Sequence, residues 1–145
     1  MHSVPDHPAV FNSTVDRERK RIRTEILGRI GLAQVEEYIA RKVKEDTMPF
    51  ADLIDARHAS TGISAHDIHH LVGILKRIAG GAQLGPVAMV VADSVTYGMT
   101  RMMAALIEGT VSIHPFRDVE KAEERLGAAA QGWGGWRGGG RFAGA

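Results

Sequence analysis

The apolar run Val87 to Ala92 constrains the fold of this chain more than any other feature. It carries no polar side chain, as expected of a strand that is covered on both faces of a sheet. Segments with helical periodicity precede and follow it, so its neighbours must be reached through crossover connections. We therefore expect a central strand in a largely parallel sheet, with Leu53-Ile54 in a flanking strand.

The first part of the chain predicts a β-hairpin. Val10 to Val15 suits a strand, and the polar stretch Asp16 to Arg19 suits a tight turn. Arg21 to Ile30 alternates between apolar and charged side chains, which is the period of a half-exposed strand. We expect one face of this strand to carry Ile22, Thr24 and Ile26, and the other Arg21, Arg23 and Glu25.

Two helices are expected next. Gly31 precedes a helix whose apolar stripe is Leu32, Val35, Ile39 and Val43. Pro49 then begins an extended segment, Phe50 to Ala56, which a loop reaching Ser64 should follow. Ser64 and Asp67 have the spacing of a capping box before the second helix, and Gly80-Gly81 ends it. The inner stripe of this helix is Ile68, Leu71, Val72, Leu75 and Ala79.

The remaining elements are two helices and a strand. Asp93 or Ser94 can cap the third helix, and Asp118 can cap a short fourth helix that Gly127 ends. Thr110 to Phe116 is expected to be a strand between them, and its proline indicates a sheet edge or the end of a strand. The expected inner stripes are Val95, Met99, Met102, Met103 and Leu106 in the third helix, and Val119, Ala122 and Leu126 in the fourth.

The order of these elements is ββαβαβαβα. It predicts an α/β fold with a mixed, mostly parallel sheet of about five strands and right-handed crossovers. We expect one domain over residues 10–127, a disordered leader over residues 1–9 and a disordered tail over residues 128–145. The tail is rich in glycine and has too few apolar side chains to bury a core.

Composition excludes several classes of site. The chain has no cysteine, so it has no disulfide, no thiolate metal site and no cysteine nucleophile. Its formal net charge of +1 gives no general attraction to nucleic acid or to an anionic membrane. No signal peptide is visible, and no run approaches the ~20 apolar residues of a membrane span. We expect a cytoplasmic protein that does not insert into membranes.

Four short strings lie at the ends of expected strands or the starts of expected helices. They are Leu53-Ile54-Asp55-Ala56-Arg57, Leu84-Gly85-Pro86-Val87-Ala88, Tyr97-Gly98-Met99 with Arg101, and Phe116-Arg117-Asp118. Together with the order of elements, these strings resemble the STAS-like domains, specifically the small bacterial SpoIIAA-like proteins. The resemblance spans about residues 10–127 and implies a STAS-like fold with helices packed against the sheet.

The resemblance also implies a non-enzymatic interaction or regulatory domain in bacterial signalling. Such domains act as anti-sigma factor antagonists, transporter tails and modules of stress-signalling assemblies. In the antagonists, a serine in an Asp-Ser-Ser-Gly string is phosphorylated by a partner kinase. The same region here reads Ser60-Thr61-Gly62 without the leading Asp. By this resemblance Ser60 and Thr61 are the candidate phosphoacceptors, and the partner is a protein such as a kinase or signalling regulator, with a homodimer left open.

The expected interaction site is at the carboxyl end of the sheet, where open α/β sheets usually bind ligands. A phosphate there would lie near a helix N-terminus, which favours negative charge. A simpler interpretation is that Ser64 is a helix cap and its neighbours are turn residues. The candidate residues are Asp55, Arg57, His58, Ser60, Thr61, Ser64, Asp93, Ser94 and Tyr97.

Two alternative functions stay open. One is a small hydrophobic-ligand or lipid-binding domain, whose adaptable pocket could be lined by Met89, Met99, Met102 and Met103, although such methionines are more often plain core. The other is RNA contact through the Gly/Arg/Trp tail, but we do not expect a nucleic acid partner from only Arg137 and Arg141. A ligand binder should enclose a pocket, whereas an interaction module should be nearly solid.

No recognised motif predicts catalysis. The chain has no GxSxG string and no Walker A string. His66 and His70 share one helical face, but neither an HExxH string nor a carboxylate cluster accompanies them. We therefore expect solvated histidines, no metal, no cofactor and no enzymatic activity.

Overall fold

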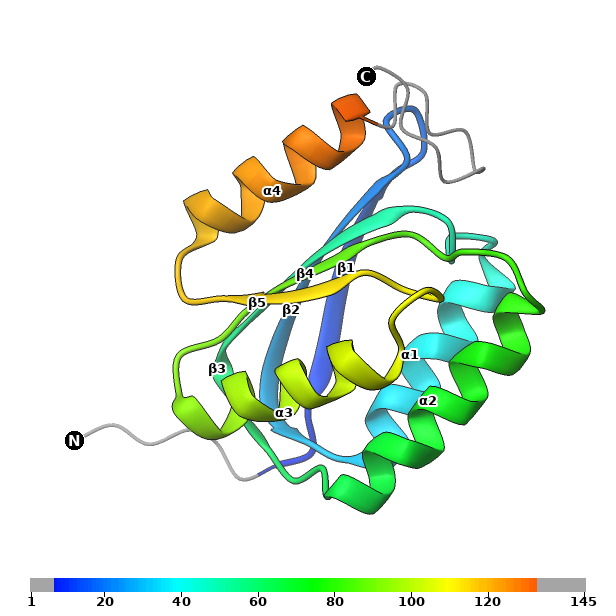
Figure 1. The fold of residues 1–145 in the computed structure, drawn as a ribbon. Coiled ribbons are helices and arrows are strands. Elements are labelled where there is room, and N and C mark those ends of the chain that lie inside the picture. Colours follow the sequence, from blue (N-terminus) through cyan, green and yellow to red (C-terminus); the bar gives the residue numbers. More distant parts are fainter. Residues whose placement is uncertain (1–6, 133–145) are drawn as a thin grey trace.

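A mixed sheet of five strands forms the centre of the computed structural model, which describes residues 7–132 (Figure 1). The strands lie side by side in chain order. The first two are antiparallel, and every other neighbouring pair is parallel. The expected fold class and order of elements are confirmed. The strands are β1 (Val10–Asp16), β2 (Arg21–Ile30), β3 (Ala51–Thr61), β4 (Val87–Val90) and β5 (Ile113–Phe116).

Helices cover both faces of this sheet. On one face lie α1 (Leu32–Lys44), α2 (Ala65–Ala79) and α3 (Ser94–Leu106), and on the other lies α4 (Val119–Gly132) (Figure 1). The α4 side buries a small cluster that includes Leu53, Val90 and Leu126. The three-helix side buries the larger clusters. The part of the chain that the structure describes has no helix long and apolar enough to cross a membrane.

Pairing within the sheet follows the sequence pattern. Along β2 the even-numbered side chains are buried on the three-helix side, and Arg23 and Glu25 on the opposite face are exposed. β4 lies between β3 and β5, with Ala88 opposite Leu53. Its two faces are covered by α4 and by the three helices, as expected of an apolar run. β5 is an edge strand, as its proline predicted.

The helix ends also follow the sequence. The Ser64 hydroxyl accepts a hydrogen bond from the Asp67 amide, and the Asp67 carboxylate accepts one from the Ser64 amide, each at 3.0 Å. Gly80 ends α2 in the left-handed conformation, which glycine adopts without steric cost. Asp93 caps α3 by accepting from the Thr96 amide at 3.0 Å. These bonds satisfy amides that the helices themselves leave unpaired.

Several expected boundaries are wrong. β3 continues through the expected loop to Thr61 because it pairs with β2 as far as Ile30. Thr110 to Ser112 precede β5 rather than belonging to it, and α4 continues past Gly127 to Gly132. The end of the expected leader is ordered, since the Ala9 amide donates to the Arg29 carbonyl at 2.9 Å. Residues 1–6 and 133–145 lie outside the described residues, so their expected disorder stays a prediction.

The inner faces of α1 and α3 are rotated from the expected stripes. Val95 is 65% exposed, and Val43 is exposed as well. In α3 the buried positions are Thr96 and Thr100, and in α1 they are Tyr38, Ile39 and Lys42. Both helices therefore direct polar side chains at the sheet, which a search for apolar periodicity does not find.

Candidate functional site

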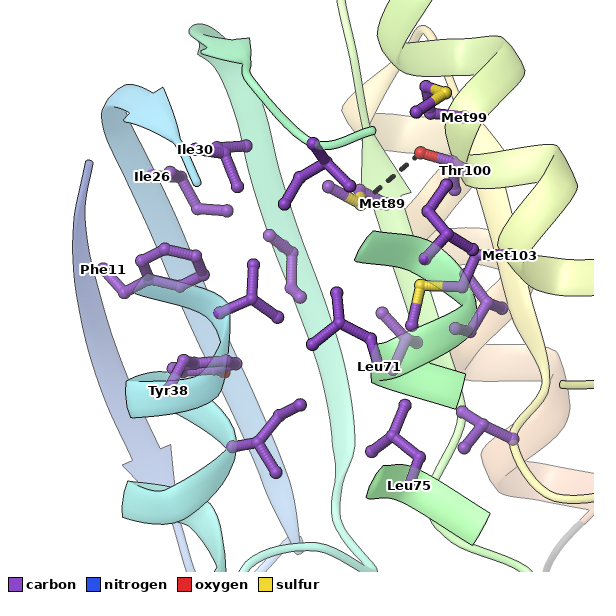
Figure 2. Close-up of a pocket in the computed structure, with 18 of the residues that line it drawn as sticks. Phe11, Ile26, Ile30, Tyr38, Leu71, Leu75, Met89, Met99, Thr100 and Met103 are labelled. Carbon is purple, nitrogen blue, oxygen red and sulfur yellow. Dashed lines mark hydrogen bonds between the residues drawn. The ribbon is translucent and has the colours of Figure 1, made fainter. Parts of the chain in front are cut away.

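An apolar cavity lies between the sheet and the three helices α1, α2 and α3. Its volume is about 160 Å³, and its lining is almost entirely hydrocarbon and thioether. Figure 2 shows side chains from β1, β2, β4 and all three helices converging on it. Labelled examples are Phe11, Ile26, Tyr38, Leu71, Met89 and Met103.

This volume is large for the interior of a small domain. Protein cores normally leave few voids larger than a water molecule. An apolar cavity of roughly 150 Å³ can stay dry and bind benzene. The cavity therefore has room for a small apolar molecule. Met89, Met99 and Met103 line it, whereas Met102 does not, and unbranched thioethers can adapt to a ligand's shape.

A buried polar network closes the end of the cavity near the amino ends of β2 and β3. Asp52 is completely buried, and its Oδ1 accepts a hydrogen bond from the Thr24 hydroxyl at 3.0 Å. Its Oδ2 accepts hydrogen bonds from the Tyr38 hydroxyl and from Lys42 Nζ, the latter at 3.1 Å. The side chain of Lys42 is only 9% exposed, so its charge is compensated mainly by Asp52.

The Tyr38 hydroxyl keeps its proton in this network. Burial raises its pKa far above the usual range, and the neighbouring Asp52 charge raises the pKa further. The ring stacks on Phe11, with centroids 4.8 Å apart, and Lys42 Nζ lies 5.4 Å from the ring centroid. The network thus ties β1, β2 and β3 to α1 and leaves no uncompensated charge at this end of the cavity.

Threonine hydroxyls lie at the opposite end, near the carboxyl ends of the strands. Thr61, Thr96 and Thr100 all line the cavity. The Thr61 hydroxyl accepts from the Ile63 amide at 3.2 Å, and the Thr100 hydroxyl donates to the Thr96 carbonyl at 2.8 Å. The Thr96 hydroxyl oxygen is buried and has no hydrogen-bond partner among the described residues. This end can therefore form a hydrogen bond with a ligand.

A solved structure shows which known fold this arrangement belongs to. It is the crystal structure of an uncharacterised DUF3478-family protein with a SpoIIAA-like fold from Shewanella loihica PV-4. The superposition covers 87% of this chain and 99% of that one, with a TM-score of 0.55 and 14% sequence identity. This chain has a SpoIIAA-like fold. No family model matches the sequence, and no curated protein matches it either.

The SpoIIAA-like domain separates the residues of the expected interaction site. Asp55, Arg57, His58, Ser60 and Thr61 all belong to β3 rather than to a loop. Thr61 lines the cavity, and Ala59 is buried with the three-helix cluster. Because side chains alternate along a strand, His58 and Ser60 lie on the opposite face. The candidate phosphoacceptors Ser60 and Thr61 thus point to different sides of the sheet.

Asp55 and Arg57 form a local ion pair near the middle of β3. The Asp55 carboxylate accepts bonds from Arg57 Nε at 2.9 Å, from Arg57 Nη2 at 2.8 Å and from the Arg57 amide at 3.1 Å. These bonds hold the pKa of the Asp55 carboxyl below its usual value. The Asp55 carboxylate already accepts three hydrogen bonds, so we interpret the pair as structural rather than as a binding site.

A third group of expected residues meets beside the start of α3. Arg117 donates to the Ala92 carbonyl at 3.3 Å and lies 3.5 Å from the Ser94 hydroxyl oxygen. Its guanidinium carbon lies 4.7 Å from the centroid of the Tyr97 ring. Ser94 and Tyr97 are therefore brought together by a residue that was not a candidate. Ser64 and Asp93 are helix caps, as their positions predicted.

The histidines of α2 form no evident metal site. His66 and His70 are exposed, and His70 Nε2 lies 2.9 Å from a carboxylate oxygen of Glu36 on α1. Within residues 7–132, no group of three or more His, Asp or Glu side chains is arranged to hold a metal ion.

Sequence reasoning missed the polar residues of the cavity. Thr96, Thr100 and Met103 follow one helical face, together with Ile107 just beyond α3. That spacing was available in the sequence, but threonine is less apolar than Val95 and Met102, which were expected to face inward. Tyr38 and Lys42 were four residues apart on α1 and lay next to positions assigned to the core. Only their burial against Asp52 shows their role.

Proposed function

We propose that this SpoIIAA-like domain binds a small apolar molecule in the cavity between the sheet and α1, α2 and α3. The observation that carries the proposal is the cavity itself, with its volume of about 160 Å³ and its apolar lining. This favours the ligand-binding alternative over a nearly solid interaction module.

The energetic argument starts from the cost of an unfilled cavity. Residual cavity volume in a core costs about 24 cal/mol per Å³. A volume of about 160 Å³ then corresponds to roughly 4 kcal/mol, which is a large part of the 5–15 kcal/mol by which domains are usually stable. An apolar ligand restores the missing contacts, so its binding should stabilise the folded state through linkage.

Toluene is a suitable first probe, because it is slightly larger than benzene and wholly apolar. We expect it to raise the melting temperature and to shift NMR signals of the cavity methyl groups in a saturable way. Leu71 lies in the cavity lining (Figure 2). Leu71→Phe should fill part of the space and weaken toluene binding at least tenfold.

Leu106→Phe is the matched control. Leu106 is half-buried on α3 and does not line the cavity, so the same exchange there should leave toluene affinity unchanged. Failure of toluene to bind the wild type in a saturable way would refute the proposed cavity function. Equal losses of affinity in both variants would show that the probe does not occupy this cavity.

A second candidate function is recognition of a protein partner at the carboxyl end of the sheet. The observation that favours it is Val95, which is 65% exposed in the first turn of α3, the helix on which Arg117 stacks over the Tyr97 ring. Tyrosine and arginine are enriched in protein–protein interfaces. By the resemblance to STAS-like domains, the partner would be a kinase or another signalling regulator.

Two substitutions test this second candidate separately from the cavity. Val95→Glu should reduce capture of a purified partner without changing toluene affinity. Ser60→Asp should weaken capture with a normal melting curve if a charge at the Ser60 face controls binding. Identical capture by the wild type and both variants would remove this surface from consideration. Sedimentation of the purified chain would identify a homodimer.

A further inference from the structure

The cavity has one polar feature that its apolar lining does not explain. Resting on the proposed function, we infer that the natural ligand is a small neutral molecule with one hydrogen-bonding group, and that the Thr96 hydroxyl binds that group. The inference concerns the chemical class of the ligand and the atom that selects it.

The first observation is the state of the Thr96 hydroxyl. Thr96 is 4% exposed and lines the cavity. Its Oγ1 makes no hydrogen bond of normal length and angle in the part of the chain that the structure describes, although the Asp93 carboxylate lies near it. Buried hydroxyls in folded proteins are nearly always hydrogen-bonded. A polar group on a ligand would supply the missing partner.

The helix backbone does not supply that partner in this structure. Thr100, one turn later, donates to the carbonyl of Thr96 at 2.8 Å, which is the common back-bond of a helical threonine. Thr96 is in the first turn, and the carbonyl four residues before it belongs to Ala92, which precedes α3. That carbonyl accepts from Arg117 at 3.3 Å. The backbone amide of Thr96 already donates a hydrogen bond to the Asp93 carboxylate.

The charges around the cavity determine which polar group fits. Lys42 at the opposite end is paired with Asp52 at 3.1 Å, so it does not provide a free cation for a carboxylate. Met89, Met99 and Thr100, which line the cavity with Thr96, are uncharged, and the charged group beside Thr96 is the Asp93 carboxylate, which accepts from its amide at 3.0 Å. An anionic group would lose its hydration there and would meet the Asp93 carboxylate instead of a counter-ion. A hydroxyl, a carbonyl or a similar neutral group needs only one hydrogen bond.

Phenol and toluene form a matched pair of probes for this inference. They have nearly the same shape and differ by a hydroxyl in place of a methyl group. Thr96→Val makes the corresponding change on the protein, replacing the hydroxyl by a methyl group. Measuring both probes on both proteins by calorimetry gives a double-mutant cycle, in which the different hydration of the two probes cancels.

We expect Thr96→Val to lower the ratio of phenol affinity to toluene affinity about fivefold, the value of one net hydrogen bond. Thr110→Val is the control, because Thr110 is half-buried and does not line the cavity. It should leave the ratio unchanged. NMR of Thr96 labelled at its methyl group should show a larger shift with phenol than with toluene.

The outcomes separate this inference from the proposed function. Saturable toluene binding with the same affinity ratio in the wild type and Thr96→Val would overturn the role of Thr96 and leave the cavity function standing. A fall in the ratio that is equally large in Thr110→Val would also overturn it. If neither probe binds the wild type, the proposed function and this inference both fail.

Discussion

Asp52→Asn provides the sharpest test of the polar network that closes the cavity. The Asp52 side chain is completely buried, and its carboxylate is the partner of Lys42, Tyr38 and Thr24. The amide keeps the size of the side chain but removes its charge. The Lys42 ammonium, with a side chain 9% exposed, then has no counter-ion. Breaking a buried ion pair in this way costs about 3–5 kcal/mol.

This loss is large compared with the whole stability of a domain, which is about 5–15 kcal/mol. For a domain of this size it corresponds to a fall in melting temperature of roughly 10–20 °C. Urea unfolding monitored by far-UV circular dichroism would give the change in the free energy of unfolding directly. A cost below about 1 kcal/mol would refute the view that Asp52 compensates the charge of Lys42.

Two further variants identify the cause of the loss. Lys42→Met in the Asp52→Asn background removes the uncompensated charge, so the double variant should be more stable than Asp52→Asn alone. Simple additivity of the two single losses would contradict the coupling. Asp16→Asn is the matched control, because Asp16 pairs with Arg19 at an exposed site. It should leave the melting temperature nearly unchanged.

Three other predictions concern the scaffold. Ser64→Ala removes the hydroxyl that caps α2 and should cost ~1 kcal/mol in urea unfolding, whereas an unchanged midpoint would show that the cap is dispensable. Gly85→Ala would place a Cβ in steric conflict with the Phe50 carbonyl oxygen and should lower the melting temperature strongly, while Gly98→Ala, which meets no atom within 4 Å, should not. The Arg57 bonds keep the pKa of the Asp55 carboxyl below the ordinary aspartate value of 3.8. Its contribution to stability is therefore complete above that pH and is lost as the pH falls through the lower folded pKa. In a plot of the free energy of unfolding against pH, Asp55→Asn should therefore lose less stability than the wild type as the pH falls. Parallel plots for the two proteins would contradict this role of Asp55.

Features set by neighbouring residues were predictable from the sequence. The alternation of Arg21 to Ile30 gave the buried face of β2, and the capping box at Ser64 gave the start of α2. Gly80 gave its end, because the left-handed conformation is a property of that residue and its neighbours. The apolar run at Val87 gave a strand covered on both faces. Together these local signals were sufficient for the order of elements and the fold class.

The length of β3 depended on contacts between distant residues. The polar stretch from Asp55 to Thr61 resembled a loop, because no local pattern marked it as a strand. It is a strand because β2 extends to Ile30 and offers hydrogen-bonding groups along its whole edge. That pairing separates Ser60 from Thr61 and divides the expected interaction site between the two faces of the sheet.

The cavity could only be found in the tertiary structure. A sequence shows which side chains are apolar, and Met89, Met99 and Met103 were candidates for that reason. Whether such side chains fill the space between a sheet and three helices depends on distances that no local pattern records. The same holds for Asp52 and Lys42, which are 10 residues apart in the chain and meet because α1 packs across β2 and β3. The sequence by itself determined the elements and their order, because those depend on neighbouring residues. The tertiary structure decided the cavity, the ion pair of Lys42 with Asp52 beside it and the surroundings of the Thr96 hydroxyl, because those depend on how the elements pack.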